Sequence, residues 1–217
     1  MHQLATKPLG IDDGGKPRDL GQTPGDIIVL SAADTELASL SQARAKLPEK
    51  DFPSLRLASL LQLSHDHSVE HYVEDVIGHA KLVVVRLLGG RGYWPFGTGE
   101  IARVCGDQGI PVAFLPGDDQ PDVELAALST VPPDAQHRLW QYCVQGGPEN
   151  TLDFLRFAAS LTGHGTEWRE PRPLVRAGLY WPGLESPDLK AIRAQWKAPG
   201  EVAAPVAAVV FYRALVQ

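Results

Sequence analysis

The chain has 217 residues, of which 44% are hydrophobic, and a formal net charge of -6 at pH 7. This acidic balance, without a cluster of Lys or Arg, argues against nucleic acid or an anionic membrane surface as the main partner. The sequence contains no run of 18 apolar residues and no apolar core of a signal peptide, so we expect a soluble cytoplasmic protein. Cys105 and Cys143 have no CxxC partner, which favours two buried thiols over a disulfide or a metal site.

The first quarter of the chain predicts a loop segment followed by one strand and one helix. Residues 1–25 are rich in Gly, Asp, Pro and Lys and should be mainly loop, with a possible short strand at 2–6. The sequence DIIVLS at 26–31 predicts the first confident strand. Asp34 then stands where a helix cap belongs, and Pro48 should follow the end of that helix.

A second strand and an amphipathic helix should follow. The sequence LRLASLL at 55–61 predicts the strand. Apolar residues then recur at positions i, i+3, i+4, i+7 and i+8, which is the spacing of one face of a helix. They are Val69, Tyr72, Val73, Val76 and Ile77, and the helix should end at Gly78.

The stretch KLVVVRLLGGRGYWPFGTG at 81–99 predicts the centre of the fold. Its continuous run of branched residues, Val83 to Leu88, is typical of a parallel strand covered by helices on both faces. A short helix over 99–108 and a fourth strand over 110–115 should follow. Strands alternating with helices predict an α/β fold with an open parallel sheet wound by helices on both faces, flavodoxin-like or Rossmann-like.

Residues 26–130 would form this α/β domain, and residues 131–162 a helical segment interrupted at Gly146-Gly147-Pro148. Residues 163–200 predict an extended excursion rich in Pro and Trp, with a short helix over 187–196. A linker is the alternative interpretation of that segment. Residues 201–217 contain another apolar run, which predicts a strand that returns to the sheet or opens a further, truncated α/β unit.

Several long motifs resemble one protein family. RLLGGRGYWPFG, with LGQTPGDIIVLSAADTELASL before it and LASLLQLSHDHSVEHYVEDVIGHAKLVVV between them, resembles the amino-terminal region of the cobaltochelatase large subunit (CobN type). This family is related to the H subunit of magnesium chelatase. The resemblance continues through LPGDDQPDVELAALSTV and AGLYWPG to VAAVVFYRALVQ, so it spans nearly the whole chain.

The resemblance implies the front part of a much longer enzyme of aerobic cobalamin biosynthesis, which inserts Co²⁺ into the corrin hydrogenobyrinic acid a,c-diamide. ATP and Mg²⁺ would be used by two smaller AAA+-related subunits (CobS and CobT type), and the chain indeed lacks a GxxxxGK[ST] motif. The chain would bind no cofactor itself and would pack against the remaining domains of the same polypeptide. Catalytic residues are expected outside it, so it should be inactive alone.

Two other functions stay open at this point. A magnesium chelatase H-type subunit that binds a porphyrin would have the same architecture, and the spacing of residues cannot choose the metal. A flavodoxin-like module that binds a ligand or a partner without catalysis is the alternative from another class.

Arg86, Arg91, Tyr93 and Trp94 are the candidate substrate-binding residues, because open α/β sheets bind ligands at the carboxyl ends of their strands. The guanidinium groups would pair with carboxylate side arms of a corrin, and the rings, with Phe96, would form a flat apolar wall. The alternatives are a structural ion pair of Arg86 with Asp118 or Asp119, and packing of the rings against the next helix or a later domain. GGRGYWP lacks the third glycine of a dinucleotide fingerprint, so no such site is expected.

The weak metal candidates are His67, His71 and Glu74. The two histidines have the i, i+4 spacing that can hold a transition metal on one helix face. A solvated helix face with stabilising polar pairs is the favoured interpretation. Asp118 and Asp119 follow a glycine, as turn residues commonly do, so no metal site is assigned to them either.

Overall fold

The structure is a computed structural model that describes residues 16–48, 50–173, 178–184 and 187–196. The chain divides into two compact units, Met1–Arg172 and Pro173–Gln217. The strands predicted at 2–6 and within 201–217 lie outside the described residues. In the second unit, the short helix predicted over 187–196 is present as α7 (Leu189–Gln195).

Four parallel strands form the sheet of the first unit, in the order β2-β1-β3-β4. The strands are β1 (Ile27–Ser31), β2 (Leu55–Ser59), β3 (Leu82–Leu87) and β4 (Val112–Pro116). Every residue of β1 and β4 is buried, as continuous apolar runs require when both faces are covered. The predicted open parallel α/β sheet is confirmed.

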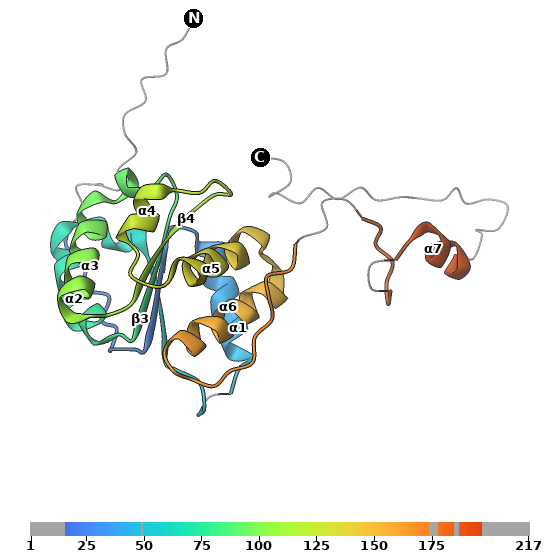
Figure 1. Cartoon of the computed structure of the whole chain (residues 1–217), viewed down its shortest axis with the longest axis horizontal. Helices are drawn as coiled ribbons and strands as arrows, with labels where there is room; N and C mark the ends of the chain where they lie inside the picture. Colours follow the sequence, from blue (N-terminus) through green and yellow to red (C-terminus); the bar gives the residue numbers. More distant parts are fainter. Residues whose placement is uncertain (1–15, 49, 174–177, 185–186, 197–217) are drawn as a thin grey trace, which may run out of the picture. The chain divides into compact units, whose positions relative to one another are not determined.

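Helices cover both faces of the sheet (Figure 1). Along the sheet, the chain moves in one direction from β1 to β2 and in the other direction from β2 to β3 and from β3 to β4. Because all these crossover connections are expected to be right-handed, helices that follow the two directions lie on opposite faces of the sheet. One face carries α1 (Asp34–Ala45), α5 (Pro133–Gln145) and α6 (Gly147–Leu161). The other carries α2 (Asp66–Asp75), α3 (Pro95–Gln108) and α4 (Val123–Leu128). The segment 131–162 therefore completes one helical layer of the sheet.

Several element boundaries differ from the prediction. The predicted second strand is too long, because the chain leaves β2 after Ser59 and forms a 3-10 turn, η1 (Leu60–Leu63), that buries Leu60 and Leu63. Asp34 is the first residue of α1 instead of its cap, where its charge still favours the helix amino terminus. Helix α3 starts four residues earlier than predicted, at Pro95. Proline suits this position because backbone N–H groups in the first helical turn have no acceptor within the helix, so the N–H that proline lacks is not missed.

One further helix boundary differs from the prediction, and another agrees with it. Helix α2 stops at Asp75 and continues as a separate 3-10 turn, η2 (Ile77–His79), in place of one helix that reaches Gly78. The break between α5 and α6 is where the glycines predict it. Gly146 has φ 60° and Gly147 φ 83°, a left-handed conformation that glycine adopts without a steric penalty.

Other parts of the chain close both edges of the sheet. At the β2 edge, Gln22 donates its side-chain N–H to Leu57 O at 2.9 Å. At the β4 edge, Phe114 N donates to Ser129 Oγ at 2.9 Å, and Gln136 Nε2 donates to Phe114 O at 2.8 Å. Side chains thus satisfy backbone groups that would otherwise attract a further strand.

One carboxylate joins the amino ends of three neighbouring strands. Asp26, just before β1, accepts hydrogen bonds from Ser54 N at 2.8 Å and Ser54 Oγ at 2.6 Å, and pairs with Lys81 Nζ at 2.9 Å. Ser54 and Lys81 directly precede β2 and β3. These hydrogen bonds, first those from Ser54 and then that from Lys81, hold the pKa of Asp26 well below its usual range.

In the described part of the chain, no helix has the length and apolar character to cross a membrane.

Asp26→Asn should lower the free energy of unfolding by about 1 to 2 kcal/mol at pH 7, because an amide loses the charge-assisted bonds. The depressed pKa means that this stabilisation is present above the ordinary value of 3.8 and is lost as the pH falls below it. Urea unfolding between pH 7 and pH 2.5 measures the free energies of unfolding of the original chain and of Asp26→Asn. The difference between these two free energies should therefore become smaller as the pH falls. A difference that stays constant over this range would contradict the assignment, and Asp51→Asn at an exposed loop position is the control.

Candidate functional site: the carboxyl edge of the sheet

The carboxyl edge contains the point where the order of the strands reverses. After β1 the chain enters α1 on one face, and after β3 it enters α3 on the other. Ser31 and Arg86 are register partners at the carboxyl ends of these two adjacent strands. Such a reversal opens a crevice that binds the ligand in many open α/β sheets.

Arg86 lies at this strand reversal, on the face that α1 and α5 cover, and all three nitrogens of its guanidinium donate hydrogen bonds. It forms an ion pair with Glu36 in the first turn of α1. It also donates from Nη2 to Gly117 O at 2.9 Å and from Nε to Pro116 O at 3.3 Å. Ser31 Oγ donates to the second oxygen of Glu36 at 2.6 Å. Both charged side chains are only 17% exposed, so the strand reversal holds a largely buried ion pair.

The structural ion pair that the sequence suggested for Arg86 exists, but its carboxylate is neither of the two that were named as examples. Glu36 takes the place expected of Asp118 or Asp119, both of which are exposed. Asp118 instead accepts a hydrogen bond from Gln120 N at 3.1 Å in a surface turn. The sequence did contain a signal for Glu36. This residue lies five positions after the end of β1, and the carboxyl ends of parallel strands lie at the same edge of the sheet, so Glu36 could be expected near the end of β3.

Trp94 lies on the opposite face of the sheet and is 2% exposed, within the core that α2 and α3 form. Its Nε1 donates to Leu63 O at 2.9 Å, which joins the segment after β3 to η1 after β2. The indole lies against Gly97 of α3, where a β-carbon would be 2.1 Å from the ring. This is the packing against the next helix that was the alternative interpretation of the aromatic residues.

Arg91 and Tyr93 lie in a 3-10 turn, η3 (Arg91–Tyr93), between β3 and α3. Arg91 is exposed and Tyr93 is half-buried. Gly90, with φ 72°, brings the backbone so close to α4 that a β-carbon there would lie 2.8 Å from Asp122 Oδ2. The four predicted substrate-binding residues therefore do not converge on one pocket, and their contact with a substrate stays a prediction.

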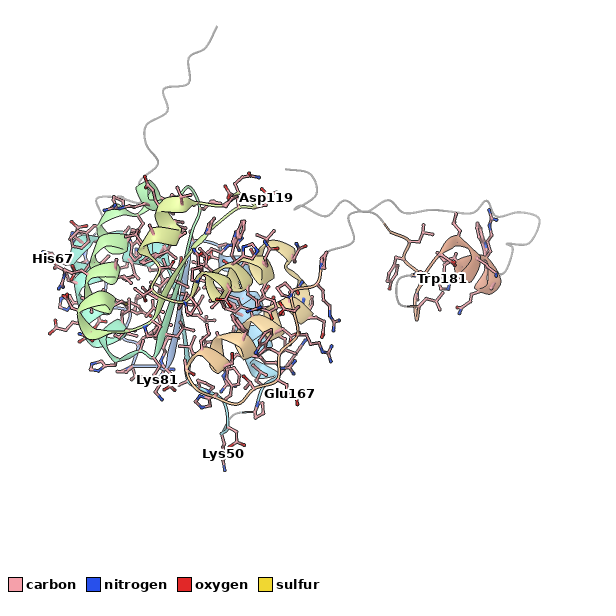
Figure 2. All side chains as sticks on the ribbon, viewed as in Figure 1. Lys50, His67, Lys81, Asp119, Glu167 and Trp181 are labelled. Atoms are coloured by element: carbon pink, nitrogen blue, oxygen red, sulfur yellow. The ribbon has the colours of Figure 1, made fainter. Side chains whose placement is uncertain are left out.

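The histidine candidates lie on the outer side of α2, with His67 pointing away from the sheet in Figure 2. His67 Nδ1 lies 2.7 Å from Glu70 Oε2, an i, i+3 pair on an exposed helix face. His71 and Glu74 are also exposed. Among the residues that the structure describes, no three side chains of His, Cys, Asp or Glu are grouped to hold a metal ion.

The two cysteines are free thiols with little nucleophilic character. Burial raises the pKa of Cys105 to about 12. Burial also raises the pKa of Cys143, and the neighbouring Glu36 carboxylate raises it further. Both groups are therefore protonated at neutral pH, whereas the reactive form of a cysteine is the thiolate.

A cleft of about 500 Å³ lies between the loop after α1 and the segment after α6. The sequence did not predict it, because its walls come from segments more than 100 residues apart. Phe52 and Trp168 provide apolar walls, while Arg156 there already pairs with Asp153 at 3.0 Å. The cleft lies away from the carboxyl edge and brings together none of the predicted site residues.

Fold and edge together define a doubly wound α/β domain with a largely buried ion pair at the point where the strand order reverses. No family model matches the sequence. Two curated relatives, the aerobic cobaltochelatase subunits CobN of Pseudomonas aeruginosa and of a Sinorhizobium species, are each 41% identical over 100% of this chain. The catalytic subunit of cobaltochelatase from Mycobacterium tuberculosis, at 24% identity and a TM-score of 0.57, has the same fold over 73% of this chain and 12% of its own.

The chain is thus related along its whole length to CobN-type cobaltochelatase subunits, and the resemblance inferred from its motifs is confirmed. It spans 17% of the length of these curated relatives.

Gly97→Ala should destabilise the chain by about 1 to 3 kcal/mol, because the new methyl group overlaps the Trp94 ring in a packed core. Gly99→Ala in the same helix is the matched control. A β-carbon there meets no atom within 4 Å, so alanine should raise stability by up to about 1 kcal/mol through helix propensity. Chemical denaturation of both variants measures this, and equal effects would rule out the packing of Trp94 on Gly97.

Arg86→Met should cost about 3 kcal/mol of stability, because it leaves the Glu36 carboxylate poorly solvated and unpaired. Combined with Glu36→Gln, the loss should be smaller than the sum of the single losses by at least about 1 kcal/mol. The exposed pair Arg103–Glu100 on α3, changed in the same way, should couple by less than about 0.5 kcal/mol. Additive losses at Arg86 and Glu36 would contradict a structural ion pair.

Proposed function

We propose that this chain forms the amino-terminal part of the large subunit of an ATP-dependent aerobic cobaltochelatase, with Co²⁺ and hydrogenobyrinic acid a,c-diamide as substrates. The observation that carries the proposal is the 41% identity to two CobN subunits over 100% of the chain. A match that extends over the loops and termini as well as the sheet is more specific than a shared α/β fold, which hosts many functions.

Several properties of the chain agree with a division of labour between subunits. Its sequence contains no GxxxxGK[ST] motif, so ATP hydrolysis falls to two smaller AAA+-related subunits of CobS and CobT type, which also use Mg²⁺. Cobalt insertion requires a base that removes the pyrrole protons of the macrocycle. The buried thiols are protonated, and His67 lies exposed beside Glu70, far from any pocket wall described above. Metallation therefore belongs to the remaining polypeptide, and this part is inactive alone.

Substrate contact by this part of the enzyme would come from Arg91 and Tyr93. Arg91 is the predicted site residue most open to solvent, and a guanidinium suits the carboxylate side arms of a corrin. Arg86 already forms an ion pair with Glu36, and Trp94 is buried, so neither side chain is available to a substrate.

Cobalt insertion by the full-length protein, mixed with both partner subunits, ATP, Co²⁺ and the corrin, tests the proposal by the change in corrin absorbance. We expect insertion that depends on all components. Arg91→Ala should raise the KM for the corrin about tenfold with kcat unchanged, since a lost charge-assisted contact is worth about 1.4 kcal/mol. Arg103→Ala, an exposed arginine of α3 paired with Glu100 and Asp107, should leave both constants unchanged.

Other outcomes separate the alternatives. Insertion of Mg²⁺ into a porphyrin in place of Co²⁺ into the corrin identifies a magnesium chelatase H-type subunit. Failure of both reactions supports a non-catalytic module. An unchanged KM in Arg91→Ala, with cobalt insertion intact, removes Arg91 from the substrate site.

A further inference from the structure

Large hydrophobic side chains are exposed at one end of the first unit only, within its described residues. They are Leu61, Leu88, Phe96 and Val123. Each belongs to the segment that follows a strand at the carboxyl edge of the sheet, and Leu88 and Val123 are 57% and 81% exposed. Scattered exposed apolar residues are ordinary, but their collection at one edge is typical of an interaction surface. We call these four residues the apolar rim.

Short contacts hold the segments of the apolar rim together. Gly117 N donates to Leu87 O at 2.8 Å, and a β-carbon on Gly117 would lie 2.6 Å from Leu88 Cα. The close approach of Gly90 to Asp122 brings the same loop beside the start of α4, which carries Val123. The bond from Trp94 to Leu63 joins the segments of Phe96 and Leu61. The segments that carry the rim residues are therefore held to one another by short contacts.

Folding of this unit does not require the exposed side chain of Val123. Asp122 caps α4 by accepting hydrogen bonds from Glu124 N at 2.9 Å and Leu125 N at 3.0 Å. Leu125 is fully buried and anchors the helix to the sheet. A polar residue at 123 would leave the cap and the anchor intact, so the exposed side chain of Val123 is free for a contact outside the unit.

The charges beside the apolar rim indicate what kind of surface fits it. Asp118, Asp119 and Glu124 are exposed near Leu88 and Val123, together with Arg91, while the exposed Arg18 lies at the first turn of α2, where its N–H donates to Ser68 Oγ at 2.7 Å. Figure 2 shows Asp119 at this end of the sheet and Lys50 at the other. These acidic groups beside exposed apolar side chains complement a protein surface with an apolar centre and basic flanks.

We propose that the apolar rim is the docking surface for a later part of the same polypeptide, one that presents an apolar patch bordered by Lys or Arg. This inference rests on the proposed function, under which the chain belongs to a longer protein. Because the chain spans 17% of its CobN relatives, most of such a protein is available to cover the rim. Side chains block both edges of the sheet, so docking occurs through side-chain packing and not through strand addition.

Photo-cross-linking in the full-length protein tests the docking. A benzophenone amino acid replaces Leu88 or Val123, one at a time, and cross-links are mapped by mass spectrometry. Both positions are already exposed in this unit, so the replacements should not disturb its core. We expect intramolecular cross-links from both positions to residues beyond 217. Lys50, exposed at the opposite end of the sheet, is the control and should give a yield at least tenfold lower, on the order expected for an unoccupied surface.

Cross-links confined to residues 1–217, cross-links to a partner subunit in place of the same polypeptide, or no cross-links would each overturn the docking proposal. Cobalt insertion is measured on the same preparations. Insertion without the cross-links defeats the docking proposal alone, whereas the cross-links without insertion defeat the proposed function alone.

Discussion

The ion pair between Arg86 and Glu36 places a strong constraint on the fold. Arg86 stands in a strand whose neighbouring positions are fully apolar, and a guanidinium in such surroundings needs a carboxylate and further acceptors. Glu36 provides the charge, while the carbonyl groups of Pro116 and Gly117 each accept one further N–H group. One side chain therefore ties the start of α1 and the end of β4 to the middle of the sheet.

This arrangement changes what the carboxyl edge can do. In many doubly wound sheets the crevice at the strand reversal is open to a ligand. Here the protein fills that crevice with its own charges, and Ser31 satisfies the outer oxygen of Glu36. The exposed side chains at this edge lie in the segments that follow the strands. They are Arg91 in η3 and the four residues of the apolar rim. The edge is thus better suited to contacts with a large partner surface than to enclosing a small molecule.

The two faces of the sheet are stabilised in different ways. On the α2 and α3 face, the indole of Trp94 packs over Gly97 and bonds to the backbone of η1, so an aromatic residue next to exposed loops belongs to the core. On the α1, α5 and α6 face, the core is combined with the polar cluster around Arg86. The chain is 41% identical to two CobN subunits over 100% of its length, so the relationship includes both faces of the sheet.

The sequence by itself determined the class of fold, the four strands and most of the helices, because continuous apolar runs, 3.6-residue periodicity, glycines and prolines act locally along the chain. It also determined the relationship to CobN, through long motifs in a conserved order. Only the tertiary structure decided that Glu36 neutralises Arg86, that Trp94 is buried while Arg91 is exposed, and that the apolar rim is one surface. These outcomes depend on the strand order β2-β1-β3-β4, which brings Glu36 to Arg86 from 50 positions away, and no local pattern encodes that order.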